Sequence, residues 1–550
     1  MRGGRVVALC AASALLLGVL QLTLPATGSD LSAQVARAGF FAAHGAAPVD
    51  LRWYGGVHPW GYSLLSPPLM ALLGVRLTGA LALLASATAL AALLVRTRVP
   101  RPLLGGLVGV LTIAGNLVSG RVTYALGVAF GLAALLALTL PAGAVRSRWW
   151  RGGLAVPAAL FASAASPVAG LFVGLAGVAL LLTRRYADGL LLAVPAAVPI
   201  AVTGLLFGEG GWMNISGTDT LHAVVTSLLA AALVGYRPVR VGALLSAAGV
   251  LAAALLHTPV GLNATRLVVM FALPVLAAAA RLPERLTRRL PARLAPPPHR
   301  TSGSTPDRAA GARRGPAARA LPGAVGLVAL LAAVAWWQPP VVAADLGSAD
   351  DPTADPAYFA PLRAELTRRG LTGRVEVPPT RNYWEAARLG EVPLARGWLR
   401  QADIARNPLF FTTVPGATGT GVPLTADSYR AWLADHAVQY VAVPDAELSW
   451  VGRPEAELVT GGLPYLTEVW SDPHWRLYAV TDPTPLVGAP GELLRQDAAT
   501  VTFRAAGPGR VPVRVRHDRW LTVSGGATLA PDGDWTMVTV PRAGTYTLGG

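Results

Sequence analysis

Residues 5–30 read RVVALCAASALLLGVLQLTLPATGSD, an apolar run of about 20 residues that is long enough to cross a lipid bilayer. Arg2 and Arg5 precede the run, and the carboxylate of Asp30 follows it directly. A cleaved signal peptide has a shorter apolar core, so we expect a retained membrane anchor. Beyond Asp30, apolar residues recur from Leu31 to Phe41 at the spacing of an amphipathic helix, which we expect to lie on the outer membrane surface.

The composition extends this interpretation to most of the chain. Of the 550 residues, 53% are hydrophobic and only 14% are charged, and the mean hydropathy is +0.48. These values exclude a soluble enzyme, a disordered chain and a disulfide scaffold, and they indicate an α-helical polytopic membrane protein. About eleven apolar segments are candidate transmembrane helices of a length near the roughly 20 residues that a bilayer requires. They are residues 5–26, 70–95, 102–118, 122–141, 153–166, 168–183, 189–207, 222–236, 240–257, 264–280 and 322–338.

The distribution of arginine predicts the orientation of these segments. The net charge is +16, with 27 arginines and 7 acidic residues before residue 339, and 19 arginines and 23 acidic residues after it. With the N-terminus in the cytoplasm, 22 of the 27 arginines fall in cytoplasmic segments, as the positive-inside rule requires. We therefore expect a multi-pass plasma-membrane protein whose C-terminal half is extracytoplasmic. Because the arginines are scattered between apolar segments, we expect no nucleic-acid partner.

Changes in composition along the chain predict five parts. Residues 1–280 form a transmembrane core and residues 322–338 a last transmembrane helix. Between them, residues 281–321 are rich in Pro, Arg, Ala and Gly, which predicts a basic, disordered cytoplasmic linker. Residues 339–484 combine helical and strand patterns and predict an α/β domain, and residues 485–550 alternate short strands with turns and predict a β-sandwich module.

Within the soluble half, both helices and strands are expected. Helices are expected at 355–369 and 426–436, and strands at 374–377, 440–443, 475–480, 500–505, 511–515, 520–523 and 535–540. Segments 381–385 and 396–403 are rich in polar and aromatic residues, which suits glycan binding, although core packing is the commoner use of a tryptophan.

The predicted outward loops hold most of the unusual polar residues of the membrane half. Asp30 is either a solvated N-cap of the following helix or a functional carboxylate at the membrane boundary. Further along the same loop, segment 48–62 is dense in aromatic and charged side chains. An interfacial aromatic belt accounts for its rings but not for its charges, which are those of Asp50, Arg52 and His58.

Two further outward turns each place an arginine close to the membrane. Arg121 lies in segment 119–124 and Arg266 in segment 259–266, which also holds Asn263. Such an arginine needs a carboxylate or a lipid phosphate as its partner. If the turns converge on the first loop, they form an anion site above the bilayer. The glycine-rich loop that ends in Trp212 is a candidate lid.

This arrangement resembles the GT-C superfamily of membrane glycosyltransferases, and more closely the actinobacterial proteins that join a GT-C-type core to an extracytoplasmic domain. The shared features are an acid directly after the first span, an amphipathic helix, and an aromatic segment leading into the second span. The resemblance covers roughly residues 1–340. It is carried by Asp30 and by segments 53–56, 62–69, 120–121, 166–170 and 261–266.

The resemblance implies a polyprenyl-phosphate-linked sugar donor bound at the outer face of the lipid bilayer, and an envelope glycan or glycolipid as acceptor. It also implies that an acid of the first loop is the general base, and Asp30 matches that position. Many members carry paired acids here, which this chain lacks, so no metal ligand is assigned and the use of a divalent metal stays open. The site candidates are Asp30 and Asp50 for catalysis, and Arg52, Trp53, His58, Tyr62, Arg121, Trp212, Asn263 and Arg266 for substrate binding.

Two other functions remain open at this stage. A transporter or lipid flippase would fit the number of spans, but the spans hold few ionisable residues and show no inverted repeat. A non-catalytic scaffold for envelope assembly could keep the same fold without the reaction.

Overall fold

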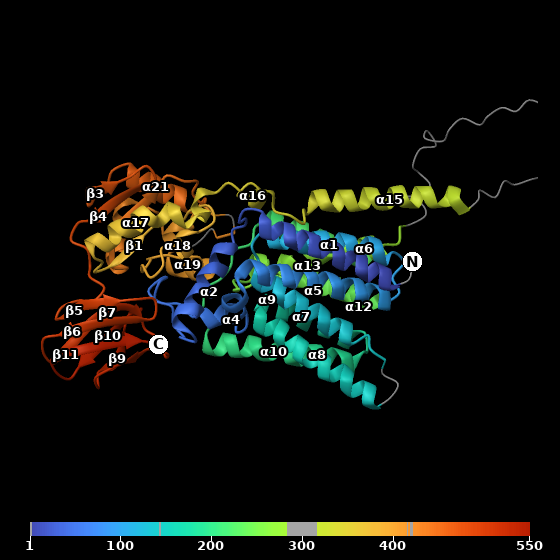
Figure 1. The fold of residues 1–550 in the computed structure, drawn as a ribbon, viewed down its shortest axis with the longest axis horizontal. Helices are drawn as coiled ribbons and strands as arrows, with labels where there is room; N and C mark the ends of the chain where they lie inside the picture. The colour runs from blue at the N-terminus through green and yellow to red at the C-terminus, as the bar shows by residue number, and fades with distance from the viewer. Residues whose placement is uncertain (1–2, 142–144, 283–315, 415, 418–421) are drawn as a thin grey trace, which may run out of the picture.

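The computed structural model describes residues 3–141, 145–282, 316–414, 416–417 and 422–550. It has a bundle of long apolar helices at one end and a soluble half built on β-sheets at the other, with the N-terminal residues at the far end of the bundle (Figure 1). Helices suit the bundle because each one satisfies its own backbone hydrogen bonds in an apolar surrounding.

Every candidate transmembrane segment forms a helix, with ends shifted by a few residues. The helices are α1 (Gly3–Thr23), α5 (Val75–Arg96), α6 (Pro102–Val118), α7 (Val122–Ala137), α8 (Val145–Ala165), α9 (Pro167–Leu182), α10 (Tyr186–Leu206), α11 (Gly217–Leu233), α12 (Arg237–Leu255), α13 (Arg266–Ala279) and α15 (Pro316–Trp337). Among the described residues, five stretches are by themselves long and apolar enough to cross a membrane, namely α1, α5, α10, α12 and Gly261–Ala279. The chain is thus a multi-pass membrane protein.

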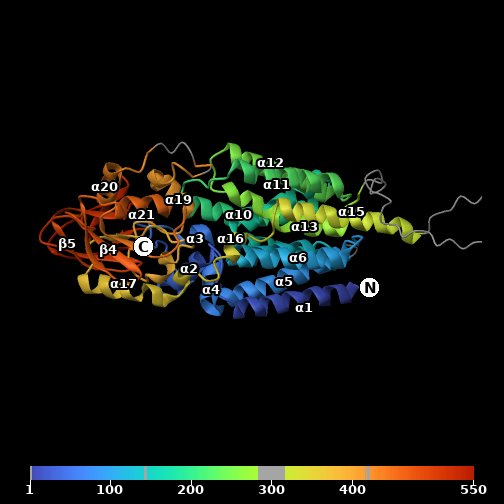
Figure 2. The same ribbon diagram turned by 90° about the horizontal axis from the view of Figure 1, so that it is seen from above.

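Small residues set the packing of the bundle. A Cβ added to Gly105 of α6 would lie 2.4 Å from the Cβ of Ala278 in α13, so these two helices approach at a distance that only glycine allows. Helix α15 lies alongside α13 in Figure 2. It begins at Pro316, earlier than the expected span at 322–338, and most of the predicted linker (283–315) lies outside the described residues.

The soluble half has the two parts that its sequence predicts. The first contains a four-stranded sheet in the order β1-β2-β4-β3, in which β1 and β2 are parallel and the other pairs antiparallel. Its strands are β1 (Arg374–Glu376), β2 (Val438–Pro444), β3 (Leu466–Ser471) and β4 (Trp475–Val480), and its helices are α16 (Ala343–Leu346), α17 (Pro356–Arg369), α18 (Glu385–Arg388), α19 (Arg400–Arg406), α20 (Ala426–Asp435) and α21 (Gly452–Thr460).

The second part holds two antiparallel sheets, in the orders β7-β10-β9 and β5-β6-β11-β8. Their strands are β5 (Gly491–Gln496), β6 (Thr500–Ala505), β7 (Gly509–Arg516), β8 (Thr522–Val523), β9 (Thr528–Asp532), β10 (Trp535–Val540) and β11 (Gly544–Gly549). Four strands were not predicted from the sequence: β3, β5, β9 and β11. They have mostly intermediate or exposed residues, so their apolar alternation is weak.

The first outward loop lies between the two halves and contacts both. It contains α2 (Leu31–His44), α3 (Pro59–Tyr62) and α4 (Ser66–Leu73). The sequence predicts that α2 lies on the membrane surface, and this prediction was wrong. The soluble half covers the helix, and Ser32 donates a hydrogen bond to the carbonyl of Asn382. Further along the loop, Val49 and Leu51 are buried in the core of the β-sheet module.

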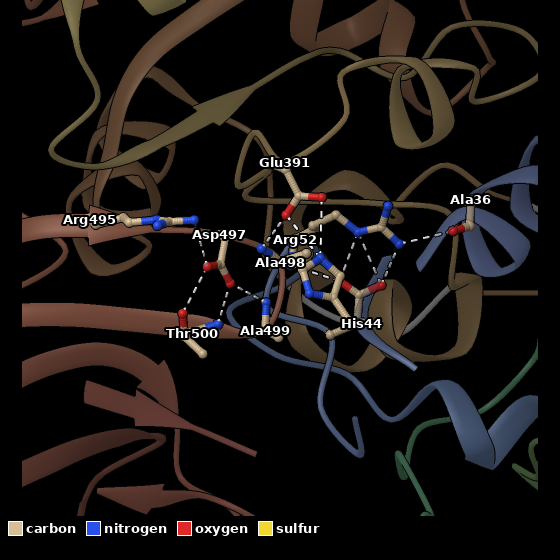
Figure 3. Close-up of polar contacts among 10 residues, drawn as sticks. Ala36, His44, Arg52, Glu391, Arg495, Asp497, Ala498, Ala499 and Thr500 are labelled. Atoms are coloured by element: carbon tan, nitrogen blue, oxygen red, sulfur yellow. Dashed lines mark hydrogen bonds and ion pairs between the residues drawn. The ribbon is translucent and has the colours of Figure 1, made fainter. Parts of the chain in front are cut away.

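Polar contacts fasten the same loop to the soluble half at its outer edge. Figure 3 shows His44 at the end of α2 facing Glu391, whose carboxylate also accepts the backbone N–H of Ala498 at 2.6 Å. Asp497, just before it, accepts the N–H groups of Ala499 and Thr500, which fixes the turn between β5 and β6. Loop, α/β part and β module therefore meet in one hydrogen-bonded junction.

A second junction surrounds His58. Its two ring nitrogens lie 3.2 Å from Glu209, in the loop after α10, and 3.1 Å from Asp518 in the β module. Glu209 also binds Arg406 of α19 at 2.7 Å. Burial lowers the pKa of His58, but the hydrogen bond to Glu209 and the charges of both carboxylates outweigh it, so the pKa is raised. This cluster joins the helical bundle to both parts of the soluble half.

The His58 junction should make stability depend on pH. Because the pKa of His58 is raised on folding, its ion pairs contribute fully below the unfolded pKa of about 6.5 and are lost as the pH rises through the folded value. We expect the melting temperature of the wild type to exceed that of His58→Gln most at low pH and to converge with it at high pH. His517→Gln, at an exposed neighbouring histidine, is the control. A gap between wild type and His58→Gln that does not change with pH would contradict this.

Gly55 allows the backbone of the loop to pack closely against Trp535 of β10. Its φ is +78°, and an added Cβ would lie 2.7 Å from the ring of Trp535. Gly45 has a similar φ of +62° and open space around it. We expect Gly55→Ala to destabilise the folded protein by about 2–4 kcal/mol, from backbone strain plus overpacking, and Gly45→Ala by about 1–2 kcal/mol from strain alone. Thermal unfolding of both variants in detergent micelles measures the difference, and equal losses would show that contact with Trp535 is unimportant.

Candidate active site

A cavity of about 880 Å³ lies where the bundle, the first loop and the soluble half meet. One side is apolar and is formed by membrane helices: Val168 and Leu171 of α9, Ile200 of α10, and Val269 and Met270 of α13. Leu171, on this side, is 39% exposed. The other side is polar and aromatic and is formed by the first loop and the soluble half.

Asp30 lies in the wall of the cavity with two arginines beside it. Its Oδ2 is 3.2 Å from Nη2 of Arg266 and 3.4 Å from Nε of Arg121. The three residues come from three separate segments, which converge in the structure. The carboxylate makes no cap hydrogen bond to the helix that it precedes. The N-cap alternative is therefore wrong, and the carboxylate is engaged by the two guanidinium groups.

Two glycines make this convergence possible. Gly28 has a φ of +96°, and a Cβ there would lie 2.2 Å from the backbone of Ser119. Gly120 has a φ of +73°, and its Cβ would lie 2.4 Å from the backbone nitrogen of Leu31. The backbone of Asp30 donates to the carbonyl of Ser119 at 3.2 Å. The two loops therefore touch through bare backbone, which brings Arg121 next to Asp30.

The arginine pair carries more positive charge than Asp30 neutralises. Burial and the nearby charge of Arg266 lower the pKa of Arg121 despite the presence of Asp30. The Nε of Arg121 is buried and has no hydrogen-bond partner, and the guanidinium of Arg266 lies 5.6 Å from the ring of Tyr124. Two guanidiniums that share one carboxylate form a site for a further anion.

Asp50 also lines the cavity, but its carboxylate is already paired. Arg52 donates to it from Nε at 2.9 Å and from Nη2 at 2.7 Å, and Nη2 also reaches the carbonyl of Ala36 (Figure 3). The pair closes the turn in which Asp50 and Val57 form a β-bridge. Arg52 does not line the cavity. Arg52 therefore stabilises the conformation of the loop.

The remaining predicted residues are divided between the cavity and its surroundings. Trp53, His58, Tyr62 and Asn263 line the cavity. Trp212 does not, because its indole stacks on the ring of His257 at a centroid distance of 4.1 Å. Its expected role as a lid over the substrate has no support in this position.

Several cavity residues were not in the predicted set. Arg37 of α2 is buried, and its guanidinium lies 3.6 Å from the ring centroid of Tyr62. Its spacing of seven residues from Asp30, two helical turns, was a signal that both face the same side of α2. From the soluble half come Tyr383, Trp398 and Arg400. They belong to the two polar and aromatic segments noted in the sequence, but no sequence signal placed them against the membrane half.

Asp30 and Asp50 do not fit a divalent cation. Asp30 is bound by Arg121 and Arg266, and Asp50 by Arg52, so neither presents a free pair of oxygens. Within the part of the chain that the structure describes, no three His, Cys, Asp or Glu side chains gather as a metal site would require.

Comparison with known proteins gives matches only among solved structures. No family model and no curated protein matches the chain. A structure of the arabinofuranosyltransferase AftD from Mycobacteria is similar over 92% of this chain, with 18% identity and a TM-score of 0.47. A mutant of AftD is similar over 99%, with 15% identity and a TM-score of 0.46. The chain spans only 41% and 60% of these two AftD chains.

ArnT from Cupriavidus metallidurans, in a structure with bound undecaprenyl phosphate, is similar over 87% of this chain and 98% of its own, with 16% identity and a TM-score of 0.44. These matches concern the overall arrangement of the chain.

Proposed function

We propose that the protein is a membrane glycosyltransferase that moves a sugar from a polyprenyl-phosphate donor to an envelope glycan or glycolipid on the extracytoplasmic side. The observation that carries this proposal is the Asp30 carboxylate between Arg121 and Arg266, in a cavity with one apolar wall formed by membrane helices. A lipid-linked phosphate needs that combination of an apolar path and a cationic end, and a sugar hydroxyl needs the carboxylate.

The proposed orientation rests on the arginines at the ends of the helices. Arg96 and Arg151 mark the end of the bundle that lies away from the soluble half. The positive-inside rule assigns this end to the cytoplasm. The cavity, at the opposite end, then opens at the outer face of the membrane, where the lipid-linked donor would be presented.

Donor binding would change the pairing of Asp30. The phosphate of the donor is an anion that Arg121 and Arg266 can bind in place of the carboxylate, while the polyprenyl chain lies against Leu171 and Met270. Asp30 then loses its two cationic partners and becomes a better proton acceptor. The donor would in this way free the base that its own transfer requires.

The transfer step follows from this arrangement. Asp30 accepts the proton of the acceptor hydroxyl, and the acceptor oxygen bonds to the anomeric carbon of the sugar. The bond between that carbon and the phosphate oxygen breaks, and its electron pair leaves with the polyprenyl phosphate. Arg121 and Arg266 stabilise the negative charge that develops on the leaving phosphate. Attack from the side opposite the phosphate gives inversion.

Asp30→Asn should abolish the reaction without disturbing the fold. We expect transfer from radiolabelled polyprenyl-phosphate sugars to fall by about 10²–10⁴-fold, because the amide cannot accept the proton. The control is Asp188→Asn, because Asp188 is also bridged by two arginines, Arg151 and Arg185, but at the other end of the bundle. Equal transfer by wild type and Asp30→Asn would assign the base to another residue. No transfer by wild type from any donor would favour the flippase or scaffold.

The arginine pair should determine donor affinity. We expect Arg121→Gln and Arg266→Gln each to weaken binding of undecaprenyl phosphate by about tenfold or more, since each removes a charge-assisted hydrogen bond to the phosphate. Arg185→Gln, in the matched cluster around Asp188, should bind as tightly as the wild type. Titration of the lipid into protein in detergent micelles measures these affinities, and unchanged binding in both cavity variants would exclude the pair as the phosphate site.

A further inference from the structure

Arg37 is a buried guanidinium that faces the cavity without a carboxylate partner. Only 4% of its surface is exposed, it lines the cavity, and its Nη1 has no hydrogen-bond partner. Aromatic rings surround it instead: its Cζ lies 3.6 Å from the ring centroid of Tyr62, 5.3 Å from that of Trp398 and 5.8 Å from that of Trp53. Such rings stabilise a cation, and the hydroxyl of Tyr62 accepts a hydrogen bond from Arg37, but the Nη1 group is left without an acceptor.

The nearest carboxylates are already engaged elsewhere. Asp50 is bound by Arg52 through both of its oxygens, and Asp30 is bound by Arg121 and Arg266. Arg52, Arg121 and Arg266 thus engage these two carboxylates, and Arg37 has no ion pair with a described residue. An unpaired donor on a buried cation costs free energy, so the unpaired Nη1 of Arg37 beside a cavity indicates a ligand that supplies the missing partner.

A second unpaired donor lies next to Arg37. Trp53 lines the same cavity, and its indole Nε1 is buried and has no hydrogen-bond acceptor. The backbone of Gly397 packs so closely on this indole that an added Cβ would lie 2.4 Å from it, so the ring is held in place. Buried donors are normally paired in folded proteins. A ligand with two acceptor oxygens would satisfy both donors.

This position is distinct from that of the donor phosphate. Arg37 follows Asp30 by seven residues, which corresponds to about 10 Å along the axis of α2. It also faces the aromatic wall formed by Tyr62 and Trp398, on the side of the soluble half. We therefore assign the anion at Arg37 to a second group and not to the donor phosphate.

We propose that Arg37 and Trp53 form an anion subsite that binds a carboxylate or phosphate carried by the acceptor sugar. This inference rests on the proposed glycosyltransferase function and specifies its acceptor as an anionic glycan. The sugar ring of such an acceptor would lie along the indole of Trp398 while its charged group reaches Arg37 and one hydroxyl reaches Asp30.

A ligand-binding role for Arg37 also predicts how its substitution changes the thermal stability of the free protein. If Arg37 were a structural residue, its removal would lower the melting temperature. If Arg37 binds a ligand instead, its buried charge destabilises the ligand-free protein. The variants Arg37→Gln and Arg37→Met should then have the same melting temperature as the wild type or a higher one.

Binding of three small sugars to the full-length protein in detergent micelles tests the subsite. Glucuronic acid carries a carboxylate, glucose 6-phosphate a phosphate, and glucose neither, so the three separate the possible anions from the sugar ring itself. We expect wild type to bind one of the two anionic sugars at least about tenfold more tightly than glucose, as a charge-assisted hydrogen bond provides. Arg37→Gln should lose this preference, and Trp53→Phe, which keeps an aromatic ring but removes the Nε1 donor, should weaken it severalfold.

Two results would overturn the subsite: no preference for either anionic sugar in the wild type, or a preference that Arg37→Gln retains. Lower melting temperatures in both Arg37 variants would also overturn it, by assigning Arg37 a structural role. Undecaprenyl phosphate is titrated in parallel, because its binding depends on Arg121 and Arg266. If the protein binds the anionic sugar but not the lipid, the proposed donor is refuted and the subsite is retained. If it binds the lipid but not the anionic sugar, the subsite is refuted and the proposed donor is retained.

Discussion

The position of the first outward loop between the two halves of the molecule is the constraint on which the rest of the structure depends. Its backbone is bonded to the soluble half at widely separated points: Leu394 donates to the carbonyl of Arg52, Leu51 to that of Ala498, and Arg516 to that of Gly55. Backbone groups buried in this way must be paired, so the loop has one conformation when the halves are docked. The cavity forms between the loop and the bundle, and its shape therefore depends on contacts made far along the chain.

Charge is the second constraint, and it opposes the first. Packing the loop against the soluble half buries the guanidiniums of Arg37 and Arg52, whereas the side chain of Arg121 is 23% exposed. Asp50 pairs with Arg52, and the charges of Asp30 and Asp345 act on Arg121. Arg37 keeps an unpaired Nη1. An unpaired buried donor is expected where a ligand completes a site, and under the proposed function the two cationic groups correspond to two anion positions.

The membrane half could be predicted from the sequence to a large extent, because apolar length and arginine position are local signals. Asp30, Arg121 and Arg266 were chosen individually, and the sequence left open whether their segments converge. Arg37 and Trp398 were missed for different reasons. Arg37 shares a helical face with Asp30, but the pattern of α2 was interpreted from its apolar residues alone. Trp398 lies more than 360 residues from Ser29, to whose carbonyl it donates at 2.7 Å, and no periodicity in the sequence reports such a contact.

That contact explains why the soluble half belongs to the proposed catalytic unit. The peptide that leads into Asp30 is held from both sides by the soluble half: Gly28 donates to Ser348, Ser29 donates to Asp345, and Trp398 donates to Ser29. On the bundle side, Asp30 itself donates to Ser119. The carboxylate therefore sits at the meeting point of two separately folded structures, each of which fixes one side of its backbone. If Asp30 is the base, the soluble half acts on the reaction by fixing the position of that base, and displacement of the soluble half would remove both the aromatic wall and the alignment of the carboxylate with Arg121.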